Sequence, residues 1–490
     1  MQKRLFLVFA TLCLLWNTVA AQKMISAQFL GSRTRAQIAS QFKYPLVQYD
    51  VRFYRVIYTT KNTAGQPDTV SGLVVVPQDT TRIFPRLVYQ HGTSVTKTDV
   101  PSFNVLGGGD GATGLLFGGM GFLTIMPDYL GLGVAKGFHP YVHAASEAWV
   151  AADMLRALPD FIAYYQTHQG TKLHTNDQLF VTGYSQGGHA SMAFHRDVEQ
   201  LWQNEFKITA ASYMSGPYSI GEVMRNTVLS DEIYLYPAYI PHTLISYQHV
   251  YGNLYGSLQQ IFREPYATAI AQHYSGSFNL ILLNTQLVNL LVQNEGSCRP
   301  MRMLQPALVQ ELKADDWHPI NVALRDNNVY QWAPKAPARI FFCTADDQVP
   351  YQNSIVARDT MIARGAINVQ TVDVNPNADH SACASPAIVN TLLFFLGYRD
   401  VGYVSSTTEA VTTQLLSLWP NPTSGIAWLT DLPGEGHLQV LDINGRLRQN
   451  VFSVTGSRYL LDLSSLEDGL YIVRFFADGR IWQNKVVLRR

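Results

Sequence analysis

A serine in a tight turn is the residue of this chain whose type and setting most clearly suggest chemistry. Residues 183–187 read Gly-Tyr-Ser-Gln-Gly and follow the apolar run 178–182, so Ser185 lies where a strand is expected to turn into a helix. Such a turn exposes the hydroxyl for attack on a carbonyl carbon, and its crowded backbone needs the small residues Gly183 and Gly187. The pattern predicts a nucleophilic serine. A glycine–serine turn that fits by chance is the alternative.

A carboxylate that could assist this serine follows a second apolar strand, predicted at residues 338–343. Asp346 comes just beyond that strand, and the carboxyl ends of parallel strands meet at one edge of a sheet. We therefore expect Asp346 to be the acid that orients a histidine. Asp347 is the alternative acid, because the sequence does not reveal which side chain points inward. An acidic turn that only caps a helix near residue 350 is the non-catalytic interpretation.

A histidine in a suitable place follows a third predicted strand, at residues 366–374. His380 lies in the loop after this strand and completes the order serine, acid, histidine that is typical of one class of hydrolase. The short interval between Asp346 and His380 fits one strand–helix–strand unit. The much longer interval between Ser185 and Asp346 implies a large insertion.

Residues 91–94, His-Gly-Thr-Ser, follow another apolar run and could supply the remaining part of such a site. The glycine lets the backbone curl so that N–H groups face a carbonyl oxygen. We expect the main-chain N–H groups of Thr93 and Gln186 to form an oxyanion hole. A plain β-turn is the alternative.

These segments together resemble the secretory lipase/esterase family of the α/β-hydrolase fold, over roughly residues 45–400. The resemblance implies an α/β fold with a mostly parallel sheet, and ester hydrolysis by a Ser–His–Asp triad through an acyl-enzyme without a cofactor. One departure is Cys343, where many family members have glycine. The motifs that carry the resemblance are His-Gly-Thr at 91–93, Pro-Asp-Tyr-Leu-Gly-Leu-Gly at 127–133, His-Pro-Tyr at 139–141, residues 151–157, the serine turn, and the Asp346 and His380 segments.

The composition fits a globular protein and argues against a nucleic-acid partner. Among 490 residues, 36 basic and 36 acidic side chains balance to zero net charge, and no basic patch rises above the background. No zinc or calcium ligand pattern is present, so we predict no metal site.

The first residues have the features of a secretory signal peptide. A basic start, a short apolar run and small residues before Gln22 predict cleavage after Ala21, so residues 1–21 would be removed. A membrane anchor is the alternative, but the run is shorter than the roughly 20 residues that span a bilayer. We therefore expect no stable membrane span.

Three cysteines remain after the signal peptide: Cys298, Cys343 and Cys383. Cys343 ends the strand before Asp346, and Cys383 follows His380 closely. If the acid and the histidine meet, these two cysteines could form a disulfide that pins the two loops together. Three buried thiols are the alternative.

The chain changes character near its end. Residues 403–415 read as a polar, threonine-rich linker, and residues 416–490 contain short alternating strands separated by turns, which predicts a small β-sandwich. Trp-Pro-Asn-Pro at 419–422, Gly-Leu-Tyr at 469–471 and the basic end resemble the C-terminal sorting domain of the type IX secretion system. The resemblance implies that machinery as a partner, and a secreted or outer-surface location. A carbohydrate- or surface-binding module is the alternative, disfavoured because no aromatic platform is evident.

Residues 216–335, within a catalytic domain expected at 22–402, are rich in tyrosine and in helical apolar spacing. We expect a helical lid over the active site, and a packed insertion without lid motion is the alternative. The predicted function is that of a secreted serine hydrolase, an esterase or lipase acting on small-molecule or lipid esters. A prolyl-oligopeptidase-type peptidase lacks support because no propeller repeat is present. A non-catalytic surface-binding protein is the third hypothesis.

Overall fold

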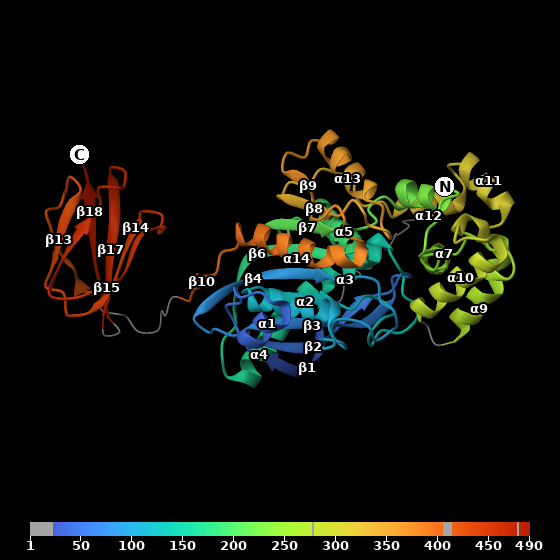
Figure 1. Ribbon diagram of the computed structural model, residues 1–490. Coiled ribbons are helices and arrows are strands. Elements are labelled where there is room, and N and C mark those ends of the chain that lie inside the picture. The colour runs from blue at the N-terminus through green and yellow to red at the C-terminus, as the bar shows by residue number, and fades with distance from the viewer. Residues whose placement is uncertain (1–22, 277–278, 405–413, 478–479) are drawn as a thin grey trace, which may run out of the picture. The chain divides into compact units, whose positions relative to one another are not determined.

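The computed structural model describes residues 23–276, 279–404, 414–477 and 480–490, and it divides into two compact units (Figure 1). The first unit ends at Val404 and the second comprises the residues that follow. The predicted signal peptide, residues 1–21, and most of the predicted linker lie outside the described residues.

Strands and helices alternate along most of the first unit. Its strands are β1 (Met24–Arg33), β2 (Val51–Lys61), β3 (Pro67–Pro77), β4 (Arg82–Gln90), β5 (Leu123–Pro127), β6 (His174–Tyr184), β7 (Ala210–Met214), β8 (Ala338–Phe342), β9 (Val369–Asp373) and β10 (Gly402–Tyr403). The helices that flank them are α1 (Arg35–Phe42), α2 (Gly109–Gly119), α3 (Ala144–Arg156), α4 (Leu158–Gln169), α5 (Gln186–Gln200), α13 (Gln352–Ala363) and α14 (His380–Leu396).

Across the residues described, these strands form one ten-stranded sheet in the order β1-β2-β3-β5-β4-β6-β7-β8-β9, with β10 beside β4. From β5 to β9 in this order, neighbouring strands run parallel. Strands β1, β2, β3 and β10 pair antiparallel. The predicted α/β class with a mostly parallel sheet is confirmed. Because β10 extends the sheet to Tyr403, the domain end expected at residue 402 falls inside a strand.

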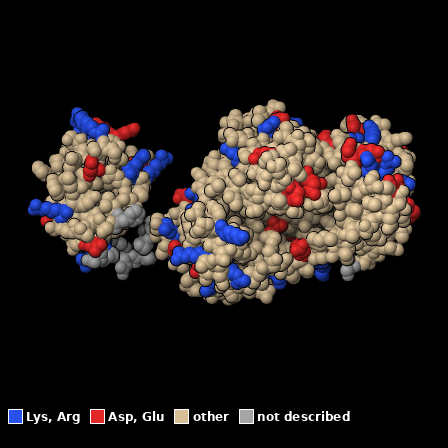
Figure 2. Space-filling view, in the orientation of Figure 1, with Lys and Arg blue, Asp and Glu red and all other residues tan. Residues whose placement is uncertain are grey.

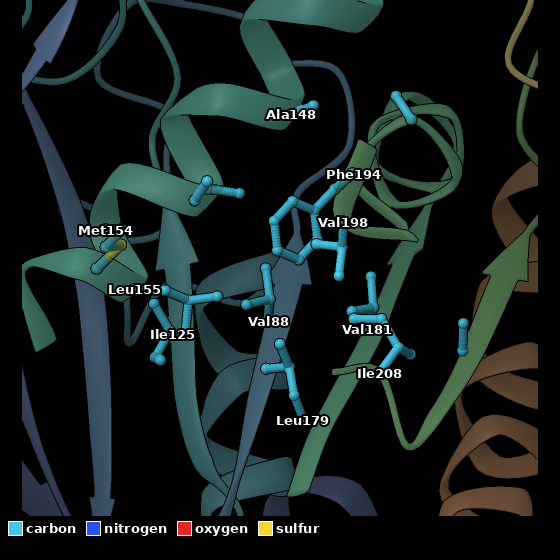
Figure 3. Packing of buried hydrophobic residues seen from close by; sticks show 14 of the residues in the cluster. Val88, Ile125, Ala148, Met154, Leu155, Leu179, Val181, Phe194, Val198 and Ile208 are labelled. Carbon is cyan, nitrogen blue, oxygen red and sulfur yellow. The ribbon is translucent and has the colours of Figure 1, made fainter. Parts of the chain in front are cut away.

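The central strands are buried on both faces, which explains their continuous apolar runs. On one face, side chains of β4 and β6 such as Val88 and Val181 pack against Met154 of α3 and Phe194 of α5 (Figure 3). On the other face, α1, α2 and α14 cover the sheet with a separate cluster that includes Phe117. The carboxyl ends of β4, β6, β8 and β9 therefore share one edge of a rigid sheet.

The insertion between β7 and β8 is helical and has a hydrophobic core of its own. Leu283, Leu287 and Leu291 recur every fourth residue on one helix and are fully buried, as an amphipathic helix requires. Figure 1 shows these helices gathered beside one end of the sheet. They are η1 (Ile220–Met224, a π-helix), α6 (Arg225–Val228), α7 (Tyr239–Tyr251), α8 (Leu258–Ile261), α9 (Tyr266–Ser275), α10 (Leu280–Glu295), η2 (Pro300–Met303, a 3₁₀-helix), α11 (Pro306–Ala314) and α12 (Pro319–Asp326).

The second unit is all β. Its described strands form a five-stranded sheet, β11-β18-β17-β14-β15, and a three-stranded sheet, β12-β13-β16, around a common hydrophobic core. The strands are β11 (Gln414–Leu415), β12 (Ser417–Trp419), β13 (Ile426–Thr430), β14 (Gly436–Asp442), β15 (Leu447–Val454), β16 (Arg458–Asp462), β17 (Gly469–Ala477) and β18 (Arg480–Leu488).

The expectation that this unit has no aromatic platform is wrong. Trp419 and Trp428 are 72% and 43% exposed and lie directly opposite each other on β12 and β13. Leu460 of β16, also exposed, is the partner of Trp428 on its other side. The platform depends on strand register, which is why the linear sequence hid it.

Candidate active site

Ser185 lies in a strained turn between β6 and α5. Its backbone has φ 59° and ψ −122°, a left-handed conformation that costs a non-glycine residue free energy and is typical of functional sites. A side chain at Gly183 or Gly187 would overlap the carbonyl oxygen of Gln90, so both positions require glycine. The side chain of Ser185 stays partly exposed at the carboxyl edge of the sheet.

His380 lies within hydrogen-bonding distance of both residues that are expected to cooperate with it. His380 Nε2 lies 2.9 Å from Ser185 Oγ, and His380 Nδ1 lies 2.7 Å from Asp346 Oδ2. The other oxygen of Asp346 accepts from the main-chain N–H groups of Gln348 and Val349, at 3.0 and 2.8 Å. The carboxylate is thus held in place from behind, and its side chain is only 1% exposed.

Asp347, the alternative acid, has a different environment. It is exposed, and its carboxylate accepts hydrogen bonds from the main-chain N–H of His380 at 3.1 Å and from the hydroxyl of Tyr236 at 2.8 Å. Asp347 therefore connects the acid loop to α14 and to the insertion, whereas Asp346 faces the imidazole ring.

The turn after β4 lies beside Ser185. Gly92 donates its N–H to Asp110 Oδ2 at 2.9 Å, and the hydroxyl of Thr93 contacts that of Tyr141 at 3.0 Å. The main-chain N–H groups of Thr93 and Gln186 donate to no other group among the residues described. These two unpaired donors lie beside the partly exposed Ser185 hydroxyl, and the N–H of Gln186 is at the N-terminus of α5. Such donors can stabilise negative charge on a substrate oxygen.

Figure 2 shows a hollow in the face of the larger unit, with acidic side chains in it and at its rim. Asp379 precedes His380 in sequence and Asp347 accepts from the main-chain N–H of His380, so these two exposed carboxylates place negative charge beside the histidine. A neutral substrate would meet less repulsion here than an anion would.

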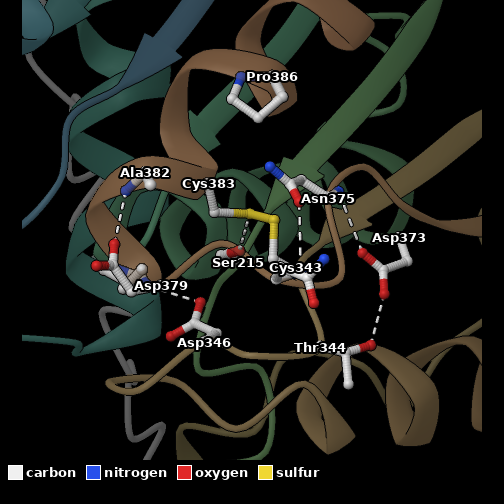
Figure 4. The surroundings of a disulfide bond; sticks show 12 residues. Ser215, Cys343, Thr344, Asp346, Asp373, Asn375, Asp379, Ala382, Cys383 and Pro386 are labelled. Carbon is white, nitrogen blue, oxygen red and sulfur yellow. Dashed lines mark hydrogen bonds and ion pairs between the residues drawn. A yellow bond between two sulfur atoms is a disulfide. The ribbon is translucent and has the colours of Figure 1, made fainter.

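A disulfide bond joins Cys343 to Cys383 (Figure 4). It links the end of β8, just before Asp346, to the first turn of α14, which begins at His380. The remaining cysteine of the described chain, Cys298, is a buried free thiol. The cross-link therefore ties together the two segments that carry the acid and the histidine.

Removing this disulfide is expected to lower the free energy of unfolding by about 2–4 kcal/mol, because it closes a loop with a sequence separation of 40. The measurement is urea denaturation of the Cys343→Ala/Cys383→Ala double variant. Cys298→Ala is the matched control, since it retains the cross-link. Dithiothreitol should destabilise the control and leave the double variant unchanged, and equal sensitivity of the two would contradict the prediction.

Sequence reasoning missed a buried polar cluster behind Ser185. No motif in the sequence singles out Glu147 of α3 or His189 of α5. Both are buried, and Glu147 Oε2 lies 2.8 Å from His189 Nδ1. The available clue was a carboxylate within a helix that is otherwise expected to be buried.

Two features are absent from the described residues, a metal-binding cluster and a membrane-spanning helix. No group of three or more His, Cys, Asp or Glu side chains there is arranged to hold a metal ion. No helix within the same residues is long and apolar enough to cross a membrane.

Comparison with known proteins identifies the C-terminal unit. A family model described as the secretion system C-terminal sorting domain matches residues 417–489. This domain marks the chain as a secreted or surface protein. No curated protein matches the chain at a significant level.

Solved structures share the fold of the larger unit. The rice cell wall degrading esterase LipA from Xanthomonas oryzae is 25% identical, with a TM-score of 0.65 over 76% of this chain and 94% of that one. A hydrolase from Legionella pneumophila, described as putative, is 24% identical, with a TM-score of 0.66 over 77% and 98%. Lipase A from Candida antarctica in its closed state is 17% identical, with a TM-score of 0.55 over 77% and 81%. The larger unit thus has the α/β-hydrolase fold of esterases and lipases.

Proposed function

We propose that this protein is a secreted serine hydrolase that cleaves carboxylic esters. The observation that carries the proposal is the hydrogen-bonded series Ser185–His380–Asp346 beside two unpaired main-chain N–H groups. The likeness to the esterase LipA and the C-terminal sorting domain support the reaction class and the location.

In this mechanism Ser185 Oγ attacks the ester carbonyl while His380 Nε2 takes the hydroxyl proton. Asp346 accepts from Nδ1–H, which holds the imidazole in the reactive tautomer and stabilises its cation. The oxyanion accepts hydrogen bonds from the main-chain N–H groups of Thr93 and Gln186. Each of these bonds stabilises the transition state by about 2.7–4 kcal/mol. His380 then protonates the leaving alcohol, and water activated by the same histidine releases the acid from the acyl-enzyme.

An apolar pocket in the insertion is the proposed site for the acyl chain. It has about 100 Å³ of space and is lined mainly by Leu and Ile side chains, with Tyr234 and Tyr239 among them. Both tyrosine hydroxyls donate to Gln348, at 3.0 Å to its main-chain oxygen and 2.8 Å to its side chain. Gln348 is two residues after Asp346, so these two lining tyrosines connect the pocket to the loop that carries the proposed acid. The apolar lining suits an apolar acyl group.

Filling this pocket is expected to shift the preference for acyl length. Thr243 of α7 lines the pocket and donates to the carbonyl of Tyr239 four residues earlier. Thr243→Phe should lower kcat/KM for the longest p-nitrophenyl ester that wild type cleaves well by about tenfold, and change acetate less than twofold. Thr285→Phe is the control, since Thr285 makes the same type of bond on an exposed face of α10. Equal effects on both esters would reject the assignment.

The test of the proposed function is hydrolysis of p-nitrophenyl esters from acetate to palmitate by the purified protein. Matched peptide p-nitroanilides test the peptidase alternative, and covalent labelling by a fluorophosphonate tests for an activated serine. Rice cell wall material is a further substrate to offer, since LipA is described as degrading it. Ester turnover with labelling supports the proposal, and neither turnover nor labelling would reject it.

A further inference from the structure

The polar cluster behind Ser185 is unusually well buried for its charge. Gln186 and Glu147 are each 1% exposed, His189 is 0% and His139 is 8%. Gln186 follows Ser185 and begins α5, while Glu147 reaches it from α3. Burying such groups is costly unless their hydrogen bonds are satisfied, so their pairing determines what the cluster can do.

Counting protons fixes the orientation of the Gln186 amide. His139 Nδ1 lies 2.9 Å from the main-chain oxygen of Leu130, which can only accept, so Nδ1 carries the hydrogen. Burial lowers the pKa of His139 to about 3, which keeps the ring neutral and leaves Nε2 as an acceptor. Gln186 Nε2 lies 3.0 Å from this nitrogen and 2.8 Å from Glu147 Oε1. The two amide protons of Gln186 are therefore donated to His139 Nε2 and Glu147 Oε1. In the reverse orientation the amide oxygen would face these two acceptors without a proton between them.

The same carboxylate also holds the next part of α5. Glu147 Oε2 contacts His189 Nδ1 at 2.8 Å, and His189 Nε2 donates to the main-chain oxygen of Asn327 at 2.9 Å. Gln186 and His189 are three residues apart, so they project from the same face of the first turn. The Glu147 carboxylate thus bridges the side chains of Gln186 and His189 in the first turn of α5. The main-chain N–H of Gln186 in this turn is the proposed oxyanion donor.

We propose that Glu147 and His139 are positioning residues, which hold the side chain of Gln186 and so fix its main-chain N–H for oxyanion binding. This inference rests on the proposed function, because it concerns the same reaction. The N–H of a first helical residue has no partner within its helix. Its direction therefore depends on how the residue itself is anchored, and here the anchor is the doubly bonded side-chain amide.

Two substitutions of Glu147 separate the effect of geometry from that of charge. In Glu147→Gln, the new carbonyl oxygen can still accept from Gln186, and the new amide N–H can donate to Nδ1 of a neutral His189. This variant should keep kcat within about threefold of wild type. In Glu147→Met, which has similar size and no acceptor oxygen, kcat should fall about tenfold with little change in KM, because misplacing one donor weakens transition-state binding.

The matched control is a second carboxylate–histidine pair on α5, in which His195 is buried and Glu199 is partly buried. Glu199 Oε1 lies 2.9 Å from His195 Nε2, and the same carboxylate accepts from the main-chain N–H groups of Lys335 and Ala336. This pair has no contact with Gln186 among the described interactions. Glu199→Met should lower the melting temperature and leave kcat per labelled active site unchanged.

The experiment measures kcat, KM and the rate of fluorophosphonate labelling for these variants and for Gln186→Met, alone and combined with Glu147→Met. The labelling rate should fall by the same factor as kcat, since the phosphoryl oxygen occupies the oxyanion site. If Glu147 acts through Gln186, the double variant loses no more than the larger single loss. If Glu147→Met does not fold, a tenfold lower kcat in Gln186→Met with unchanged KM supports the inference.

Three results would overturn it: full activity of Glu147→Met or of Gln186→Met, additive losses in the double variant, or a loss in Glu147→Gln as large as in Glu147→Met. The last result would assign the effect to charge rather than position. An inactive wild-type protein would instead reject the proposed function, so the two failures are distinguishable.

Discussion

Ser185→Ala is expected to lower kcat for ester hydrolysis by about five to six orders of magnitude. The variant lacks the oxygen that forms the acyl-enzyme, and His380 then has no hydroxyl to deprotonate at 2.9 Å. Residual turnover would come only from a water molecule attacking an ester held near the two N–H donors. The measurement is the initial rate with a p-nitrophenyl ester that wild type cleaves well, together with mass spectrometry of fluorophosphonate-treated protein, which should show no adduct.

Ser191→Ala is the matched control for this experiment. Ser191 lies on α5 as well, is fully buried, and its hydroxyl has no hydrogen-bond partner in the described part of the chain. Its removal should leave both the rate and the adduct unchanged. Retention of more than a hundredth of wild-type turnover in Ser185→Ala, or labelling at another residue, would place the nucleophile elsewhere.

The parts of the site that could be predicted from sequence share one physical property: they are local. Ser185 follows an apolar strand directly and Thr93 lies three residues after the end of another. A strand that ends at the carboxyl edge of a parallel sheet places its next residues at that edge. The glycine requirement at 183 and 187 likewise follows from a turn formed by adjacent residues. These expectations needed no knowledge of how distant helices pack.

The contacts that could not be predicted from the sequence depend on non-local packing or on the direction of one side chain. The pairing of Glu147 with His189 exists because α3 and α5 cover the same face of the sheet. The opposed Trp419 and Trp428 depend on the register of two strands, and a shift by one residue would turn one of them inward. Helical periodicity or strand alternation alone determines neither arrangement.

Asp346→Asn is expected to lower kcat about ten-thousandfold, a loss of the size typical for the acid of such a triad. Asp346 Oδ1 accepts from two main-chain N–H groups, so the asparagine oxygen would keep that place and its NH₂ group would face His380 Nδ1. A donor there favours the tautomer with hydrogen on Nε2, which can no longer accept the proton of Ser185. The measurement is kcat with the same ester, at matched melting temperature.

The adjacent carboxylate provides the discriminating comparison. Asp347 accepts from the main-chain N–H of His380 and from Tyr236, and it does not contact the imidazole ring among the interactions of the described residues. An asparagine oxygen can accept one of these bonds, so Asp347→Asn should lower kcat less than tenfold. The ratio between the two variants decides the assignment: if Asp347→Asn is the more damaging, Asp347 is the acid. If both are mild, His380 acts without a carboxylate partner, and the large loss expected from Ser185→Ala would then have to rest on the serine, the histidine and the oxyanion donors alone.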